Sequence, residues 1–191
     1  MINNFEKAIQ TILKHEGGYV DNKMDPGGAT NFGISLRFLK DFVTKKPEEF
    51  SRFDVNHDGN IDYVDIKNLP QGEAINLYKQ AFWDKNNYDK ITDFSIAEKI
   101  FDLAVNMGGA QANKLLQRAI RAVTGIKLVE DGILGTKSFA QINSADPNSL
   151  LAALKSEAAG FYRTLVRVDP NLQGFLDGWL NRSYFNLNKI S

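Results

Sequence analysis

Apolar residues at the start of the chain recur at steps of three and four, which is the period of a helix that buries one face. The residues of this stripe are Phe5, Ala8, Ile9, Ile12 and Leu13. Asn3 and Glu6 have the spacing of a helix N-cap and its capping-box partner, and Gly17-Gly18 supplies residues that end helices. The pattern therefore predicts an N-terminal helix whose last turn holds Glu16.

The same period recurs in most of the remaining chain. Apolar positions at helical spacing run through residues 36–43, 74–82, 96–107, 112–123 and 150–165. Proline residues stand where several of these segments begin or break, as expected for a residue that cannot continue a helix. Turn residues are frequent in residues 19–34 instead. We therefore predict a mainly helical protein with a small β or irregular segment near residues 19–34.

Composition narrows the class of protein. With 191 residues, 43% of them hydrophobic, the chain can form one packed globular domain or two small lobes. Its 23 basic and 23 acidic residues leave no net charge, which argues against binding of nucleic acid or of an anionic membrane. A sequence without cysteine has no thiol nucleophile, and two histidines argue against a histidine-rich metal site. We therefore expect a substrate to be bound by shape, stacking and hydrogen bonds.

Glu16 is the first candidate for chemistry. It continues the helix face of Ile9 and Ile12, so we expect its carboxyl group to point toward the protein interior. Poor solvation and the negative end of the helix dipole both favour the protonated form of a carboxyl group. Such an acid can protonate the leaving oxygen when a glycosidic bond is cleaved. The alternative is an ordinary helix-end glutamate paired with Lys14 or with a surface arginine.

The segment that follows has the composition of a turn. In Asp25-Pro26-Gly27-Gly28, aspartate opens the turn, proline sets the next backbone angle and glycine tolerates positive φ. Asp25 either caps this turn or activates a water molecule, and Thr30 can help to hold that water. A water between acid and base predicts inversion at the sugar carbon. Tyr19 and Asn31 are candidates for substrate contact.

Residues 15–34 together resemble a known family. They read His15-Glu16-Gly17-Gly18-Tyr19, then Asp25-Pro26-Gly27-Gly28-Ala29-Thr30-Asn31-Phe32-Gly33-Ile34. This motif resembles the signature of glycoside hydrolase family 108, the phage-type N-acetylmuramidases. The resemblance implies that Glu16 is the catalytic acid and that the chemistry uses no cofactor. The spacing is also similar to the glutamate, aspartate and threonine of phage lysozymes of the T4 type, except that Thr30 falls one position early.

The segment from Asp54 to Asp65 has the pattern of an EF-hand calcium loop. Gly59 stands at the sharp bend and Ile61 where a hydrophobic residue packs, while Asp65 replaces the usual glutamate. Because crowded carboxylates repel one another without a cation, we predict a structural Ca²⁺ in an insertion at about residues 50–68. The alternative is a solvated acidic turn. The predicted ligands are Asp54, Asn56, Asp58, the backbone carbonyl of Asn60, Asp62 and Asp65.

Several aromatic and amide residues are further candidates for substrate binding. Tyr78 and Trp83 either pack in the core, which is the preferred interpretation for each, or line a sugar groove with their flat rings. Asn106 and Trp179 are candidates for residues of a substrate cleft. For these two residues the default is a buried, hydrogen-bonded amide and a core tryptophan.

The second half of the chain also resembles a known module. Its motifs lie at residues 101–108, 115–119, 131–135 and 178–182. They resemble the predicted peptidoglycan-binding module that accompanies family 108 domains. The two resemblances imply a lysozyme-like fold in which two helical lobes flank a cleft. We expect residues 1–94 to form the catalytic lobe and residues 95–191 to form the second helical lobe.

The function implied by the resemblance is hydrolysis of the bond between N-acetylmuramic acid and N-acetylglucosamine in peptidoglycan. One alternative is a non-catalytic, calcium-dependent protein that binds the cell wall or assists secretion. Another is a chitinase-like hydrolase of unmodified N-acetylglucosamine polymers.

The N-terminal residues and the lengths of the apolar runs bear on where the protein acts. The residues from Met1 to Glu6 do not resemble a signal peptide, and no apolar run is long enough to span a membrane. We therefore expect a protein that is made in the cytoplasm and reaches the cell wall after release by a holin, a secretion machine or lysis. We also expect it to be a monomer. Neither nucleic acid nor a membrane is expected as a partner.

Overall fold

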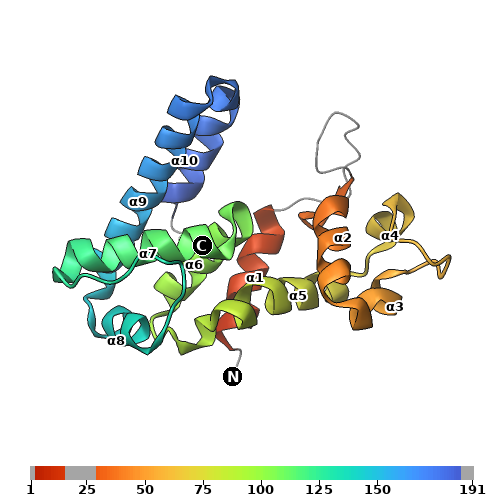
Figure 1. The fold of residues 1–191 in the computed structure, drawn as a ribbon, viewed down its shortest axis with the longest axis horizontal. Helices are drawn as coiled ribbons and strands as arrows, with labels where there is room; N and C mark the ends of the chain where they lie inside the picture. The colour runs from red at the N-terminus through yellow and green to blue at the C-terminus, as the bar shows by residue number, and fades with distance from the viewer. Residues whose placement is uncertain (1–2, 16–28, 186–191) are drawn as a thin grey trace. The chain divides into compact units, whose positions relative to one another are not determined.

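The computed structural model describes residues 3–15 and 29–185, apart from the side chains of Lys14 and His15 (Figure 1). Within these ranges the chain is mainly helical and has one two-stranded sheet, which confirms the predicted fold class. The chain divides into two compact units. The smaller unit is Ile9–Ala81, and the larger unit joins Met1–Ala8 to Phe82–Ser191. No helix in the described ranges is long and apolar enough to cross a membrane.

The N-terminal helix α1 (Asn4–His15) is the element that the sequence predicts. Its capping box is present: the Asn3 N–H donates to Glu6 Oε2 at 3.0 Å and the Glu6 N–H donates to Asn3 Oδ1 at 2.8 Å. These bonds satisfy N–H groups that have no partner inside the first turn of a helix. The predicted stripe is buried at Phe5, Ala8, Ile9 and Ile12. Helix α1 contributes residues to both units, because the division falls between Ala8 and Ile9.

Within the part of the chain that the structure describes, the smaller unit continues with a short hairpin and four helices. Its elements are β1 (Thr30–Asn31), β2 (Ile34–Ser35), α2 (Leu36–Lys45), a 3-10 turn (Pro47–Glu49), α3 (Phe50–Phe53), α4 (Tyr63–Asn68) and α5 (Gln71–Tyr78). The strands are antiparallel, with Thr30 opposite Ser35 and Asn31 opposite Ile34. Phe32 and Gly33 form the connection with φ of 50° and 75°, the signs that a tight two-residue hairpin turn requires.

Helix α2 is capped by a residue next to it in the sequence and is stabilised by a buried apolar face. The Ser35 hydroxyl accepts a hydrogen bond from the Phe38 N–H at 3.1 Å and so caps the helix, as the sequence predicts. The face of α2 with Leu39, Phe42 and Val43 is buried. Other fully buried residues of this unit are Ile34, Phe53, Ile66 and Leu77.

The larger unit is built from helices. After short 3-10 turns it contains α6 (Phe94–Met107), α7 (Gly109–Thr124), α8 (Thr136–Ser144), α9 (Pro147–Val168), η5 (Pro170–Phe175) and α10 (Leu176–Tyr184). Helices α6, α7 and α9 pack on one another around Ile100, Leu115 and Leu154, which are fully buried. Helix α10 runs beside α9 (Figure 1).

An aromatic cluster explains where the boundary between the units falls. Trp83 packs edge-on against Phe101, with ring centroids 5.3 Å apart, and against Phe5 at 5.6 Å and Tyr88 at 6.0 Å. Residues 82–94 therefore belong with the helices that follow them. The structural division at Ala81/Phe82 differs from the boundary at residues 94/95 that we expected from the sequence.

Candidate functional site

The structure describes only the two ends of the predicted catalytic motif, at residue 15 and from residue 29 onward. Glu16, Tyr19 and Asp25 lie outside the described residues, so their roles remain predictions. On the N-terminal side, α1 ends at His15 with the face of Ile9 and Ile12 buried. On the C-terminal side, the chain continues in β1 with Thr30, which is half-buried and pairs with Ser35.

Asn31, the second residue of β1, has a structural role. Its side chain is buried, and its Nδ2 donates to the backbone carbonyls of Ile66 at 2.9 Å and Lys67 at 3.2 Å. These carbonyls lie in the last turn of α4, where helix carbonyls have no partner inside the helix. Asn31 therefore links the β1–β2 hairpin, which contains Thr30, to α4, the helix after the acidic loop. The sequence predicted substrate contact for Asn31 and did not predict this link.

The first half of the acidic loop, between α3 and α4, is organised around Asp54. This carboxylate is buried, and it accepts hydrogen bonds from the Asp58 N–H at 3.1 Å and the Gly59 N–H at 3.0 Å. Gly59 has φ of 83°, which suits glycine at the bend. Ile61 is buried, as its loop position predicts.

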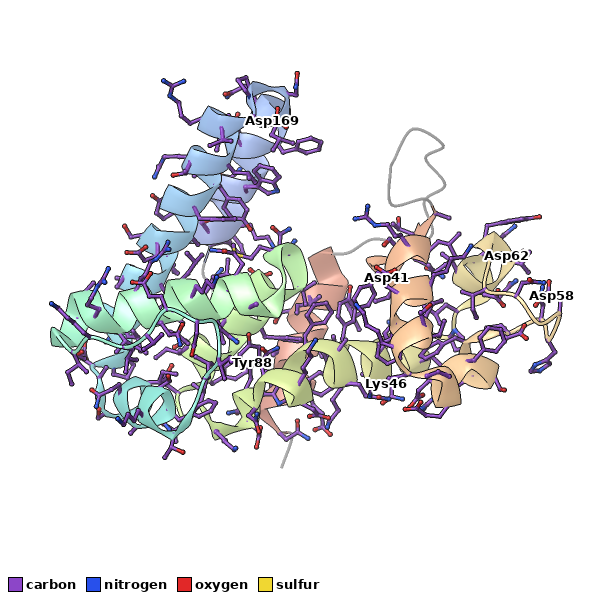
Figure 2. The ribbon with its side chains drawn as sticks, viewed as in Figure 1. Asp41, Lys46, Asp58, Asp62, Tyr88 and Asp169 are labelled. Carbon is purple, nitrogen blue, oxygen red and sulfur yellow. The ribbon has the colours of Figure 1, made fainter. Side chains whose placement is uncertain are left out.

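Asn56, Asp58 and Asn60 form the exposed tip of the loop, where Figure 2 labels Asp58. Asp58 Oδ1 accepts from the Asn60 N–H at 2.9 Å, and Asp58 Oδ2 accepts from Asn56 Nδ2 at 2.9 Å. The Asn56 amide, followed by the Asn60 N–H, holds the pKa of the Asp58 carboxyl below its usual value.

Asp62 and Asp65 form a capping box at the start of α4. Asp65 is fully buried, and its carboxylate accepts from the Val55 N–H at 2.7 Å and the Asp62 N–H at 2.8 Å. Asp65 thus connects the beginning of the loop to its end. Within the ranges that the structure describes, no three histidine, cysteine, aspartate or glutamate side chains converge as metal ligands would.

Tyr78 and Trp83 both lie in the protein core. Tyr78 is 1% exposed, and its hydroxyl donates to the Phe32 carbonyl at 2.9 Å, which supports the hairpin turn. Trp83 is 2% exposed and belongs to the aromatic cluster of the larger unit. Both residues therefore pack in the core, which is the role that we preferred for them from the sequence.

Asn106 and Trp179 come close to the same tyrosine. The Tyr162 hydroxyl donates a hydrogen bond to Asn106 Oδ1, and the Tyr162 ring stacks on Trp179 with centroids 5.0 Å apart. Phe175 stacks on Trp179 with centroids 5.6 Å apart. Tyr162 and Phe175 are not among the site residues predicted from the sequence. The four-residue spacing between Phe175 and Trp179 could have indicated that the two rings are neighbours.

A buried ionic cluster, which the sequence did not predict, lies close to this group. Asp102 on α6 accepts a hydrogen bond from Arg182 Nε at 2.9 Å, and Lys99 Nζ donates to the Arg182 carbonyl at 2.8 Å. Burial lowers the pKa of Lys99, although the nearby carboxylate of Asp102 opposes this shift. These contacts attach α10 to α6.

Comparisons with known proteins give two family matches. A family model described as Glycosyl hydrolase 108 matches residues 9–108, and a model described as Predicted Peptidoglycan domain matches residues 111–184. The solved structure of Brucella abortus SagA is similar to this chain at 24% sequence identity and a TM-score of 0.69, with 97% of each chain covered. At this identity the likeness shows a shared fold. No curated protein matches the chain.

Proposed function

This chain belongs to the glycosyl hydrolase 108 family, and from that premise we propose that it is an N-acetylmuramidase. It is a glycoside hydrolase that acts on peptidoglycan, and the bond we propose is the one between N-acetylmuramic acid and N-acetylglucosamine. One observation carries the proposal: the family match spans residues 9–108 and so includes the whole motif around Glu16. The peptidoglycan domain that follows at residues 111–184 supports the same substrate.

Glu16 is the proposed general acid. It follows directly on α1, whose buried face at Ile9 and Ile12 continues to position 16 at helical spacing. We expect a carboxyl group on that side to be shielded from water and so to favour its protonated form, as protonation of a leaving oxygen requires. Asp25 and Thr30 are the proposed groups that hold and activate water on the opposite side of the sugar, with inversion as the outcome.

We propose that the acidic loop binds a structural Ca²⁺. The side chains of Asp54, Asn56 and Asp58 would supply oxygen ligands, together with the Asn60 carbonyl, while Asp65 closes the loop behind them. The ion would neutralise the crowded carboxylates and take no part in the chemistry. Its effect would reach the catalytic motif through α4, because Asn31 binds the last carbonyls of that helix.

The catalytic proposal is tested by the release of reducing sugar from purified peptidoglycan. Glu16→Gln keeps the size of the side chain but cannot donate the proton, so the wild type should release new muramic acid reducing ends and the variant should not. Equal melting temperatures of the two proteins serve as the control. Products that end in N-acetylglucosamine would contradict the muramidase assignment, and binding without new ends would indicate an accessory protein.

The calcium proposal is tested by thermal unfolding with and without Ca²⁺. A ligand that binds the folded state raises the melting temperature, so Ca²⁺ should stabilise the wild type. Asp58→Ala should lose most of this response. Asp41→Ala, which removes an exposed aspartate of α2 in the same unit, should keep it. Equal melting temperatures of the wild type in Ca²⁺ and in chelator would contradict a structural ion.

A further inference from the structure

The hairpin of β1 and β2 has two faces with different surroundings. Asn31 lies opposite Ile34, and both residues are buried. Thr30 lies opposite Ser35, and both residues are half-buried. Because neighbouring side chains of a strand point to opposite faces, a buried Asn31 side chain places that of Thr30 on the other face. The direction of Thr30 therefore depends on the register of a hairpin that has only two residues in each strand.

So short a hairpin needs support from the rest of its unit, because an isolated two-stranded hairpin is only marginally stable in water. Part of this support is local: the Leu36 N–H donates to the Ala29 carbonyl at 2.9 Å and closes the open end of the hairpin. Further hydrogen bonds come from α4 and α5, which lie more than thirty positions away in the sequence. They hold two consecutive residues of the hairpin, Asn31 and Phe32.

The bonds from α4 select the register of the hairpin. Asn31 Nδ2 donates to the Ile66 carbonyl at 2.9 Å and to the Lys67 carbonyl at 3.2 Å. An apolar side chain of similar size would pack on the buried face without needing partners, whereas a buried amide is stable only where its bonds are made. A slip of β1 by one residue would break both bonds. The amide therefore favours the one register in which Thr30 faces away from α4.

The bond from α5 holds the turn next to Asn31. Tyr78 is 1% exposed, and its hydroxyl donates to the Phe32 carbonyl at 2.9 Å. Phe32 has φ of 50°, a backbone conformation that residues other than glycine rarely adopt. Phenylalanine at position 78 would fill the same space in the core, so the hydroxyl adds the bond that fixes this turn. Bonds from two helices to residues 31 and 32 together restrict the rotation of the hairpin.

We propose that Asn31 and Tyr78 are positioning residues for the hydrolysis. They fix the direction of Thr30, the residue proposed to help hold the attacking water, and they touch neither the sugar nor the water. This inference rests on the proposed function for the role of Thr30. Such support matters because a displacement of about 1 Å at a reacting group can lower a rate about 100-fold. Asn31, Tyr78 and their partners all lie in the smaller unit, which is one compact body.

The first measurement separates kcat from KM in Tyr78→Phe, with solubilised peptidoglycan strands as the substrate. Loss of the bond to Phe32 should lower kcat by about ten-fold or more and change KM little, because the bond supports the chemical step. Tyr88→Phe is the matched control, since it also removes a hydroxyl from a buried tyrosine that donates one bond, at 2.8 Å, in the larger unit. At a temperature where all three proteins are folded, its kcat should equal that of the wild type. Equal falls of kcat in both variants would overturn the inference.

A double-mutant cycle shows whether the two residues act through Thr30. Thr30→Ala removes the hydroxyl whose direction the hairpin fixes. Effects of residues that act as one unit are not additive, so Tyr78→Phe should lower kcat much less in the Thr30→Ala background than in the wild type. Asn31→Asp, which keeps the size of the side chain but turns an oxygen toward the carbonyls of α4, should behave in the same way. Additive losses in either cycle would overturn the positioning role of the residue concerned.

Hydrogen exchange tests the same contacts without turnover. The Leu36 N–H, which is bonded to the Ala29 carbonyl, reports on the closed hairpin. Tyr78→Phe and Asn31→Asp should each speed its exchange by about five-fold or more relative to Tyr88→Phe. Exchange at the same rate in all three variants would overturn the inference, even if the wild type cleaves peptidoglycan. Faster exchange in a protein whose wild type releases no reducing ends would overturn the hydrolase proposal and keep the control of the hairpin by these two residues.

Discussion

Individual buried polar residues hold the larger unit together at points where several segments meet. Asn113 on α7 is the clearest case: its Oδ1 accepts from the Tyr88 hydroxyl at 2.8 Å, and its Nδ2 donates to the Gly132 carbonyl and to Asn86 Oδ1, each at 2.9 Å. One amide thus joins α7 to the turns around residue 88 and to the loop before α8. Such a group stabilises the fold because every partner is satisfied.

Tyr88→Phe tests this network with the loss of one oxygen atom. Tyr88, labelled in Figure 2, is fully buried, and the variant would leave the Asn113 carbonyl oxygen without its donor. We expect the free energy of unfolding in urea to fall by about 1–3 kcal/mol, the usual cost of an unsatisfied buried polar group. Tyr184→Phe, at a residue that is 50% exposed, should change the stability much less. Equal losses for the two variants would contradict the role of Asn113.

At the scale of elements, caps and glycines determine where helices begin and end. The Asp146 carboxylate caps α9 by accepting from the Ser149 N–H at 2.9 Å and the Ser149 hydroxyl at 2.6 Å, just before Pro147 at the first helical position. Helix α6 ends at Met107 and is followed by Gly108 as its C-cap, which has φ of 86°. These signals are local in sequence, so the positions of the helices can be predicted without the fold.

The cap of α9 predicts a specific acid sensitivity. The two hydrogen bonds from Ser149 lower the pKa of Asp146 below its value in the unfolded chain. Its contribution to stability is therefore present above the unfolded pKa and is lost as the pH falls through the folded pKa. In Asp146→Asn the new amide side chain would also accept these bonds but would not titrate, so the unfolding midpoint of this variant should fall less than that of the wild type between about pH 5 and pH 2. Parallel midpoints in both proteins would exclude this cap as a source of the acid dependence.

The loop before α8 predicts a difference between two glycines. Gly132 has φ of 79°, and a Cβ atom there would lie 2.5 Å from the Ala110 carbonyl oxygen. Gly125 has φ of 74° but open space around it. The positive φ costs alanine roughly 1–2 kcal/mol at either position, and the backbone clash adds to this cost at Gly132. Gly132→Ala should therefore lower the melting temperature more than Gly125→Ala, and the reverse order would show that the loop can move away from α7.

At the scale of the whole molecule, the two units share one helix. Phe5 and Ala8 of α1 belong to the larger unit, whereas Ile9 and Ile12 belong to the smaller one, and all four are buried. A helix whose buried residues are divided in this way cannot unfold in one unit without losing contacts in the other. We therefore expect the two units to unfold together.

This coupling can be measured because both tryptophans, Trp83 and Trp179, lie in the larger unit. Tryptophan fluorescence therefore reports the larger unit, while far-ultraviolet circular dichroism reports the helices of both. The urea midpoints from the two methods should coincide, as expected for one cooperative transition. Two separate midpoints would show that α1 does not couple the units.

The sequence by itself determined the class of fold, most helix positions and the family. Helical periodicity, the Asn3–Glu6 capping box and the Ser35 cap depend on residues three or four apart. Such short-range signals can be recognised in the sequence without knowledge of the fold. The family motif is equally local, because it is a contiguous run around Glu16.

Tertiary structure alone decided what individual polar and aromatic residues do. It uses Asn31 to hold α4, and it connects Asn106 to Trp179 through Tyr162. It also assigns residues 82–94 to the larger unit. These outcomes depend on contacts between residues that are tens of positions apart, and no local pattern specifies which side chains meet across such separations.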